Sequence, residues 1–436
     1  MSTQSAAWIA AARLVRRTGF GASGPAVDAV VRSGPETYLA GLLAPAADPG
    51  AAATPLPPFP PLAPVGRNAD RAARLARNKQ RREQLQQLTS WWLGRMLSVH
   101  QPFTERITFG WHDHFATAAS KVRSATALAH QNETLRRLGT GDFRTLAQAM
   151  LVDPAMLIWL DGQKNTVRGA NENLAREFME LFALGHGDGY TETDVREGAR
   201  ALTGWRIDAG QVSATLRPRL HDQTPKTVLG VTGNLDQAGF CDAVLARPAA
   251  AGYVCGRWYG QLVSDTPPDA ATLARLVAGY GAHRDLAGLF RAAYLDESFA
   301  RAANSIVAGP VEWLIGAARA LKVGTDAATL TRLAGILRGL GQLPFDPPNV
   351  SGWPSGHAWL STAAAQLRLQ AAGWLCRTGD LSFVSAAAPG QRLDAVGYLL
   401  GVGTFSDRTA AALKPALGNP ATLVTLALTS PEYLVH

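Results

Sequence analysis

Apolar residues recur three and four positions apart along most of this chain, and this spacing constrains the fold more than any other feature. Clear examples are Trp91, Trp92, Met96 and Leu97, followed by Ile107, Trp111 and Phe115. Such spacing places apolar side chains on one face of an α-helix. The alternation that is typical of strands is confined to residues 205–222, where Gly210 marks a turn between two short alternating segments. The pattern therefore predicts a mainly α, multi-helix globular array with one small β-hairpin around residues 205–222.

The distribution of proline and alanine divides the chain into three parts. Residues 1–43 carry short amphipathic segments and predict N-terminal short helices. Residues 44–66 are rich in proline and alanine without periodicity, so we expect an extended connector over the surface. Residues 67–436 form the main all-α domain, which we divide into two lobes, 67–235 and 236–436. The hydrophobic fraction of 47% is typical of a globular protein with a large core.

The net charge of +8 is unevenly distributed, because one segment holds a dense cluster of basic residues. The cluster consists of Arg67, Arg71, Arg74, Arg77, Lys79, Arg81 and Arg82. It predicts a solvated helix face or, alternatively, a site for nucleic acid, anionic lipid or an acidic partner. Aromatic residues are not interleaved with the cluster as a platform for single strands requires. Nucleic acid is therefore a minor hypothesis.

Two features bear on the compartment in which the chain works. Cys241, Cys255 and Cys376 have no CxxC spacing, so neither a disulfide framework nor a cysteine zinc site is predicted. Arg16 and Arg17 are similar to a twin-arginine export signal, but no sustained apolar stretch follows them. No run approaches the about 18 apolar residues of a membrane span. We therefore expect a cytoplasmic chain without a membrane span.

The segment NENLAREFMELFALG, residues 171–185, holds the first candidate site. If residues 171–184 form one helix, Glu177 and Glu180 share a face with Asn173 one turn earlier. Paired carboxylates on one helical face suit divalent-metal binding or acid–base catalysis. The alternative is an amphipathic surface helix in which Arg176 neutralises Glu180.

The segment FGWHDHF places His112 and His114 two positions apart. On a helix such residues point roughly 200° from each other, so the two imidazoles do not share a helical face. They meet a common metal only if the segment is irregular. Otherwise one imidazole faces a site and the other satisfies a backbone carbonyl, or both are ordinary core histidines.

Two further segments combine polar and aromatic residues. His221, Asp222 and Lys226 follow the predicted hairpin, where they form either part of a site or a polar turn. The loop PNVSGWPSGHAW has a shape fixed by glycine and proline. Its residues Asn349, Trp353, His357 and Trp359 form either a stacking surface for a flat ligand or a plug over the core.

The motifs together resemble a known family. They are RLVRRTGFGAS, WHDHF, NENLAREFMELFALGHGDGYTETDVREGARALTGW, HDQTPKTVLG and PPNVSGWPSGHAWLST. In this order they are similar to the bacterial domain-of-unknown-function family eighteen-hundred, over nearly the whole chain from Arg13 to Thr362 and beyond. The resemblance implies a helical fold but no established chemistry. It also implies a gene neighbour that resembles alkaline phosphatases and sulfatases, and relatives many of which are exported.

The resemblance changes how the polar residues are interpreted. The residues that match its motifs are His114, Asn171, Asn173, Glu177, Glu180, Asp194, His221, Asp222, Asn349 and Trp353. A solvated face needs no particular residue at any position, whereas polar residues at fixed places within helices indicate buried groups with partners. The resemblance therefore favours a pocket around Glu177 and Glu180.

We expect a metal-dependent enzyme, a hydrolase or oxidoreductase acting on a carbohydrate or cell-envelope-type substrate in one central cavity. A divalent transition metal would be held by His112, His114 and Glu177. The expected catalytic residues are Glu177, Glu180, His221 and Asp222. The expected substrate-binding residues are Asn173, Lys226, Asn349, Trp353 and Trp359, with the tryptophan loop as a lid.

Two alternatives remain open. The first is a non-enzymatic scaffold or binding partner of the phosphatase/sulfatase-like protein, in which a buried polar network fixes the register of the helices. Arg176 and Arg200 would then neutralise the glutamates. The second is a basic nucleic-acid-binding protein that uses the cluster from Arg67 to Arg82.

Overall fold

The computed structural model describes residues 4–62, 70–187, 189–208, 213–301 and 305–436. Arg67 of the basic cluster and Gly210 of the predicted turn lie outside these residues. The fold is mainly α, as predicted, with two small antiparallel hairpins. Among the described residues, no helix is both long and apolar enough to cross a membrane.

The helices up to the central motif have the following bounds. They are α1 (Ala6–Thr18), α2 (Gly24–Ser33), α3 (Pro35–Leu43), α4 (Pro49–Ala52), α5 (Arg71–Ser98), α6 (Phe103–His114), α7 (Ala119–Val122), α8 (Ala125–Leu138), α9 (Phe143–Leu151), α10 (Pro154–Trp159), α11 (Asn173–Glu177) and α12 (Glu192–Ala201). The start of α12 is a capping box between Thr191 and Asp194, in which each side chain accepts the backbone N–H of the other residue.

The helices after the hairpins have the following bounds. They are α13 (Gln237–Leu245), α14 (Pro248–Leu262), α15 (Ala270–Tyr280), α16 (Leu286–Leu295), α17 (Glu297–Ala300), α18 (Pro310–Ala320), α19 (Ala327–Gly339), α20 (Thr362–Thr378), α21 (Ser382–Ala386), α22 (Arg392–Leu400), α23 (Asp407–Leu413), α24 (Pro420–Ala427) and α25 (Pro431–Leu434). Aspartate side chains cap many of these starts, for example Asp236, Asp269 and Asp326, because they accept the free N–H groups of the first turn.

The predicted hairpin consists of β1 (Trp205–Ile207) and β2 (Ala214–Leu216), with Trp205 opposite Leu216. A second hairpin follows, β3 (Lys226–Val228) with β4 (Val231–Gly233), which the sequence analysis missed. Its connecting residues Leu229 and Gly230 both have positive φ angles, +53° and +86°. Two positive φ angles are characteristic of the tight hairpin turn that matches the twist of the strands.

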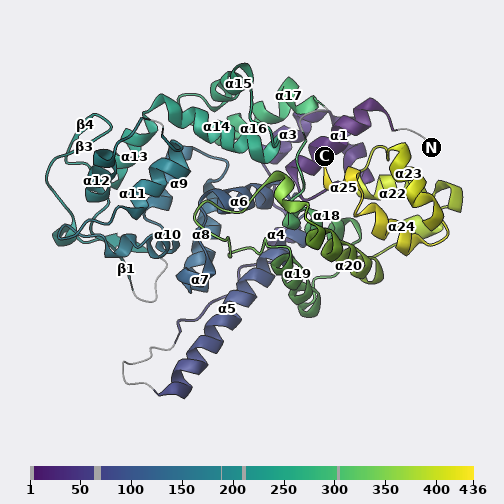
Figure 1. The fold of residues 1–436 in the computed structure, drawn as a ribbon, viewed down its shortest axis with the longest axis horizontal. Coiled ribbons are helices and arrows are strands. Elements are labelled where there is room, and N and C mark those ends of the chain that lie inside the picture. The colour runs from purple at the N-terminus through teal and green to yellow at the C-terminus, as the bar shows by residue number, and fades with distance from the viewer. Residues whose placement is uncertain (1–3, 63–69, 188, 209–212, 302–304) are drawn as a thin grey trace.

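Two buried hydrophobic clusters form the core, and α6 contributes to both. The first cluster contains residues of α1–α3, α6 and α8–α17, and the second contains residues of α5–α8, α10 and α18–α25. Ile107 and Trp111 of α6 lie in the first cluster, and Phe109 lies in the second. Figure 1 shows α6 near the middle, with α9–α13 at one end of the long axis and α22–α24 at the other. The boundary between the clusters does not fall at 235/236, because residues 240–299 pack with the first cluster.

The predicted connector and basic segment lie next to each other. Of the predicted connector the structure describes residues 44–62, which form the short helix α4 after the cap Asp48 and then, up to residue 62, a stretch without regular structure. Pro60 in this stretch accepts a hydrogen bond from Gln84 of α5 at 2.8 Å. The N-terminal part of α5 extends away from the rest of the chain (Figure 1) and its basic side chains are exposed or half-buried.

The expected continuous helix over 171–184 is wrong in its second half. The α-helical turn α11 ends at Glu177, and Phe178–Ala183 form a π-helix, η2. The carbonyls of Leu181 and Phe182, at the end of this turn, bind side chains from other helices. The hydroxyl of Tyr253 donates to Leu181 O at 2.7 Å, and His114 Nε2 lies 3.0 Å from Phe182 O. π-helical turns are frequent at functional sites, but here the two partners hold the turn in the core.

Candidate functional site

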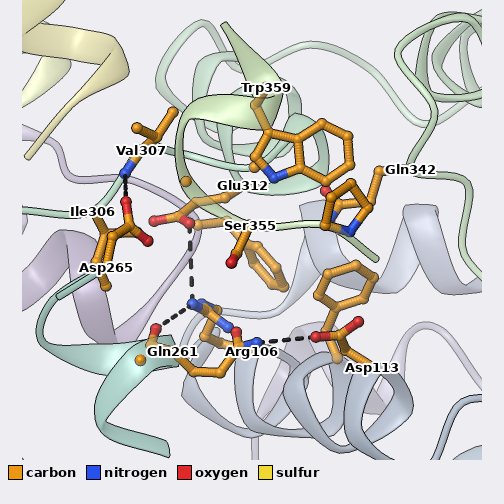
Figure 2. A pocket seen from close by; sticks show the side chains of 16 residues that line it. Arg106, Asp113, Gln261, Asp265, Ile306, Val307, Glu312, Gln342, Ser355 and Trp359 are labelled. Atoms are coloured by element: carbon orange, nitrogen blue, oxygen red, sulfur yellow. Dashed lines mark hydrogen bonds and ion pairs between the residues drawn. The ribbon is translucent and has the colours of Figure 1, made fainter. Parts of the chain in front are cut away.

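A small open pocket lies against the second hydrophobic cluster, which supplies Phe20, Phe109, Val307 and Trp359 of its lining (Figure 2). Its volume is about 60 Å³, and α6, α14, α18 and the loop after Gly352 contribute to its walls. The polar and charged residues that line it are Arg106, Asp113, Gln261, Asp265, Glu312, Gln342 and Ser355. Its aromatic walls are Phe20, Phe109 and Trp359. A pocket of this size holds water or the end of a larger ligand, since one water needs about 10–15 Å³.

Helix α6 presents one face to the pocket. Arg106, Phe109 and Asp113 are spaced at i, i+3 and i+7, which places them on the same side of the helix. The ring of Phe109 stacks on Trp353, with centroids 5.5 Å apart and an interplanar angle of 19°. The indole of Trp353 is buried and so forms the plug over the core that was one of the two expectations for it.

Asp113 is buried and accepts two hydrogen bonds. Its Oδ1 accepts the backbone N–H of Trp353 at 2.7 Å, and its Oδ2 accepts Nε2–H of Gln261 at 2.9 Å. Burial raises the pKa of Asp113, and these hydrogen bonds and the charge of Arg257 only partly oppose it. The loop approaches Asp113 this closely because Gly352, at φ +86°, has no side chain. A Cβ atom there would lie 2.3 Å from Asp113 Oδ1.

Glu312, from α18, is the second buried carboxyl group of the pocket. Arg106 Nη2 lies 4.0 Å from its Oε2 and also donates to the carbonyl of Gln261 at 2.9 Å. Burial by itself would raise the pKa of Glu312, but His436 and the charges of Arg106 and Arg17 outweigh burial and lower the pKa to about 2. Glu312 is therefore ionised at neutral pH, whereas Asp113 holds its proton to a higher pH than an ordinary aspartate.

A third group, His436, links Glu312 to a buried arginine. Arg17 Nε donates to His436 Nδ1 at 2.9 Å, and His436 Nε2 lies 3.2 Å from Glu312 Oε1. Because a guanidinium only donates, Nδ1 must be the acceptor and the ring proton sits on Nε2, facing the carboxylate. Burial lowers the pKa of His436 to about 4, so the imidazole is neutral.

One donor in the pocket has no partner among the described residues. The buried Nε–H of Arg106 makes no hydrogen bond to the part of the chain that the structure describes. Nearly all buried donors in proteins are paired, with protein or with water or ligand. An oxygen atom in the pocket would satisfy this donor.

The two histidines of the WHDHF segment hold backbone groups on opposite sides of α6. His112 Nε2 accepts the backbone N–H of Phe345 at 2.9 Å, so its proton must be on Nδ1. His114 Nε2 lies 3.0 Å from the carbonyl of Phe182, so its proton must be on Nε2. Burial lowers the pKa of each imidazole to about 3, and both are neutral. The prediction that the two rings do not share a helical face is confirmed.

The predicted metal ligands are therefore not brought together. The lone pair of His112 Nε2 and the proton of His114 Nε2 are used by backbone groups. Glu177 belongs to a different surface, beside Glu180 and His186. Within the described ranges, no group of three or more His, Cys, Asp or Glu side chains is arranged to hold a metal ion. The donor set predicted from the sequence does not fit a metal in this geometry.

Glu177 and Glu180 are half-buried beside α12. Burial and the neighbouring Glu180 raise the pKa of Glu177. Arg176 binds Glu192 at 2.8 Å and lies 3.8 Å from Glu180, which also lies 3.5 Å from His186. The neutralising role of Arg176 in the surface-helix alternative thus matches the geometry.

The remaining predicted residues of this half fix backbone segments. His221 Nδ1 lies 2.9 Å from Thr203 O, and Asp222 forms an ion pair with Arg200 at 2.7 Å. Hydrogen bonds from Arg200 and Thr224 outweigh burial and lower the pKa of Asp222 well below its usual range. Lys226 is buried, and its Nζ donates to the side chain of Asn234 at 3.0 Å.

Three further predicted residues have different surroundings. Asn173 is exposed at the start of α11, and its N–H donates to the side chain of Asn171. Asn349 is exposed and its side chain accepts the N–H of Ser351 at 2.9 Å. Trp359 is the one predicted substrate-binding residue that lines the pocket around Asp113.

Most residues of this pocket were missed from the sequence. Asp113 lies inside the WHDHF segment, and its i, i+7 spacing from Arg106 was a signal that the focus on the histidines concealed. Glu312 offered no local signal, because it reaches the pocket through the packing of α18. His436 does not line the pocket but contacts Glu312 there.

Comparison with known proteins identifies a family and no function. The model of the family described as "Protein of unknown function (DUF1800)" matches residues 13–435. No curated protein and no solved structure matches the chain.

Proposed function

Because the chain belongs to the DUF1800 family, whose description assigns no function, we propose an activity from the pocket alone: acid–base hydrolysis of a hydroxyl-rich, carbohydrate-type substrate. The single observation that carries the proposal is the pair of buried carboxyl groups, Asp113 and Glu312, on either side of Arg106 (Figure 2). Pairs of carboxyl groups whose environments move their pKa values apart are typical of acid–base catalysis.

The two carboxyl groups have complementary roles in this proposal. Asp113, whose pKa is raised by burial, donates a proton to the leaving oxygen of the substrate. Glu312, ionised and held by His436, accepts a proton from the attacking water. The water adds across the cleaved bond, so one product gains a hydroxyl group and the other a hydrogen.

Arg106 and the pocket walls position the substrate. The Nε–H of Arg106, which has no partner in the described part of the chain, is a donor for a substrate hydroxyl or ring oxygen. The volume of about 60 Å³ admits the group being cleaved, while the rest of the substrate lies against the exposed mouth residues Asp265 and Ser355. A divalent metal remains a prediction, but no step of this proposal uses one.

The proposal is tested with the purified full chain on chromogenic glycosides and soluble peptidoglycan fragments. The variants Asp113→Asn and Glu312→Gln should each lower the hydrolytic rate at least about 100-fold, since positioned acids and bases contribute that much or more. Asp242→Asn, at a half-exposed residue that does not line the pocket, is the control and should keep the wild-type rate. If the wild type hydrolyses a substrate and Asp113→Asn does so at the same rate, Asp113 is not a catalytic residue.

A second candidate function, a non-enzymatic scaffold, is favoured by the contacts that the motif residues make inside the chain. His112, His114, His221 and Asp222 each hold a backbone group or an ion pair inside the chain. This use fits a non-enzymatic scaffold for a phosphatase/sulfatase-like protein. Coexpression of the two proteins followed by size-exclusion chromatography tests it, and separate elution of two folded proteins would contradict it.

A further inference from the structure

A second, larger groove lies at the base of the projecting part of α5. It has a volume of about 470 Å³ and is formed by α5, α19, the start of α7 and residues 343–346. This volume is within the range of about 300–1,000 Å³ found for small-molecule sites. The groove shares no lining residue with the pocket around Asp113.

The groove combines an apolar floor with a basic mouth. The floor residues are Leu85, Ala119, Ala334, Leu343, Pro344 and Phe345. Arg82 from α5 and Arg338 from α19 line the mouth, and both are exposed. Asp346 is the one acidic residue in the lining, and burial raises its pKa although Arg338 opposes this effect.

Positive charge is concentrated around this mouth. The pKa of Arg81 is lowered, first by burial and then by the charges of Arg123, Arg77 and Arg82. Mutual repulsion of this kind means that a bound anion would lower the electrostatic energy of the cluster. The mouth of the groove therefore favours a negatively charged group, and the apolar floor contains no such group.

We propose that this groove binds a single-chain anionic amphiphile. The negatively charged head group lies between Arg82 and Arg338, where both guanidinium groups reach a carboxylate or a phosphate. The aliphatic chain lies on the floor against Leu85, Leu343 and Ala334 and is removed from water there. A nucleic acid would not use this site, since Phe345, the one aromatic ring of the lining, is buried rather than open for base stacking.

The test is isothermal titration calorimetry on the full chain with dodecanoate, dodecyl phosphate, dodecanol and inorganic phosphate, each below its aggregation concentration. Dodecanoate or dodecyl phosphate should bind, and the tighter of the two identifies the head group. Dodecanol and inorganic phosphate each lack one half of the ligand and should bind at least about ten-fold more weakly.

Matched variants locate the binding. Arg82→Gln with Arg338→Gln should weaken dodecyl phosphate about ten-fold or more, and Thr331→Trp, from an exposed lining position, should block the groove. Arg332→Gln, exposed on the same helix but outside the groove, should bind like the wild type.

Three outcomes would overturn the proposal. The first is that none of the amphiphiles binds. The second is that they bind equally to the wild type, the double variant and Thr331→Trp. The third is that a short DNA duplex displaces the amphiphile from the wild type, and that binding of this duplex is lost on charge reversal at Arg74 and Arg77 but kept in the groove variants.

Discussion

Asp113 Oδ1 accepts the backbone N–H of Trp353 at 2.7 Å, and this hydrogen bond ties the central helix α6 to a loop 240 positions further along the chain. The residues on either side of Asp113 make similar long-range bonds. His112 holds Phe345 of the same loop, and His114 holds the π-helix in the other hydrophobic cluster. Three consecutive polar residues of one helix thus join the two halves of the molecule.

This joint depends on a glycine. We predict that Gly352→Ala lowers the free energy of unfolding by about 2–4 kcal/mol, because the new methyl group would meet Asp113 and the φ of +86° disfavours alanine. Urea unfolding followed by circular dichroism measures the change. Gly256→Ala in α14 is the control, since a Cβ there meets nothing within 4 Å, and it should be neutral or stabilising. Equal effects of the two substitutions would contradict the role of Gly352.

His114 makes the stability of the chain depend on pH. Its folded pKa is lowered to about 3, first by burial and then by the charge of Arg257, whereas an unfolded histidine titrates near 6.5. Between these values the unfolded state binds a proton and the folded state does not, so stability is lost as the pH falls through this window. We predict that His114→Gln, which keeps a donor for Phe182 O, loses less stability than the wild type between about pH 6.5 and pH 4. Parallel stability curves for the two proteins would contradict this assignment.

The helical fold could be predicted because the apolar spacing that specifies a helix involves residues only three and four positions apart. The same spacing did not predict the π-helix, because the side chains that bind the carbonyls of this turn come from elsewhere in the chain. Tyr253 and His114 lie 72 and 68 positions from Leu181 and Phe182. The side-chain directions predicted for an α-helix over residues 171–184 therefore hold only as far as Glu177, where the π-helix begins.

The candidate site was harder to predict than the fold for a related reason. Most motif residues have partners, as expected, but several of these partners are backbone groups, which carry no signature in the sequence. Asn173 and Asn349 are exposed rather than buried, and the buried Nε1 of Trp353 has no partner among the described residues. The WHDHF segment contains Asp113, but its spacing of two histidines is a pattern for metal ligands and does not indicate a role for the aspartate between them. Glu312 reaches the pocket from α18, some 200 positions from Asp113, and no local pattern records that contact.

Asp153 should produce the opposite pH dependence to His114. It is fully buried, and burial raises its pKa to about 7 despite hydrogen bonds from Met156 N and Gln131 Nε2. Between about pH 4 and pH 7 the folded state keeps a proton that the unfolded state has lost, so stability falls as the pH rises, by about 1.4 kcal/mol per unit. We predict that Asp153→Asn, which still accepts both hydrogen bonds, removes this loss. Its stability relative to the wild type should therefore increase with pH in denaturant titrations, and a constant difference would contradict the prediction.

Among the buried carboxylates in the described part of the chain, that of Glu105 accepts the most hydrogen bonds. Its oxygens accept hydrogen bonds from Trp92 Nε1, Arg95 Nε and both Nε and Nη2 of Arg136, all between 2.7 and 2.8 Å. Burial alone would raise its pKa, but the two guanidinium groups outweigh burial and lower it.

We predict that Glu105→Gln lowers the free energy of unfolding by about 3–5 kcal/mol, because it leaves the largely buried Arg95 without a counter-charge and Arg136 with only the half-exposed Glu133. The control is Asp242→Asn, which removes an ion pair to Arg144 in which both side chains are 44% exposed. Solvent screens that pair, so its loss should cost no more than about 1 kcal/mol. Chemical denaturation of the two variants at the same pH and salt concentration compares the costs directly. If they were equal, burial would not set the strength of these ion pairs, and the same reasoning would fail for Arg106 and Glu312.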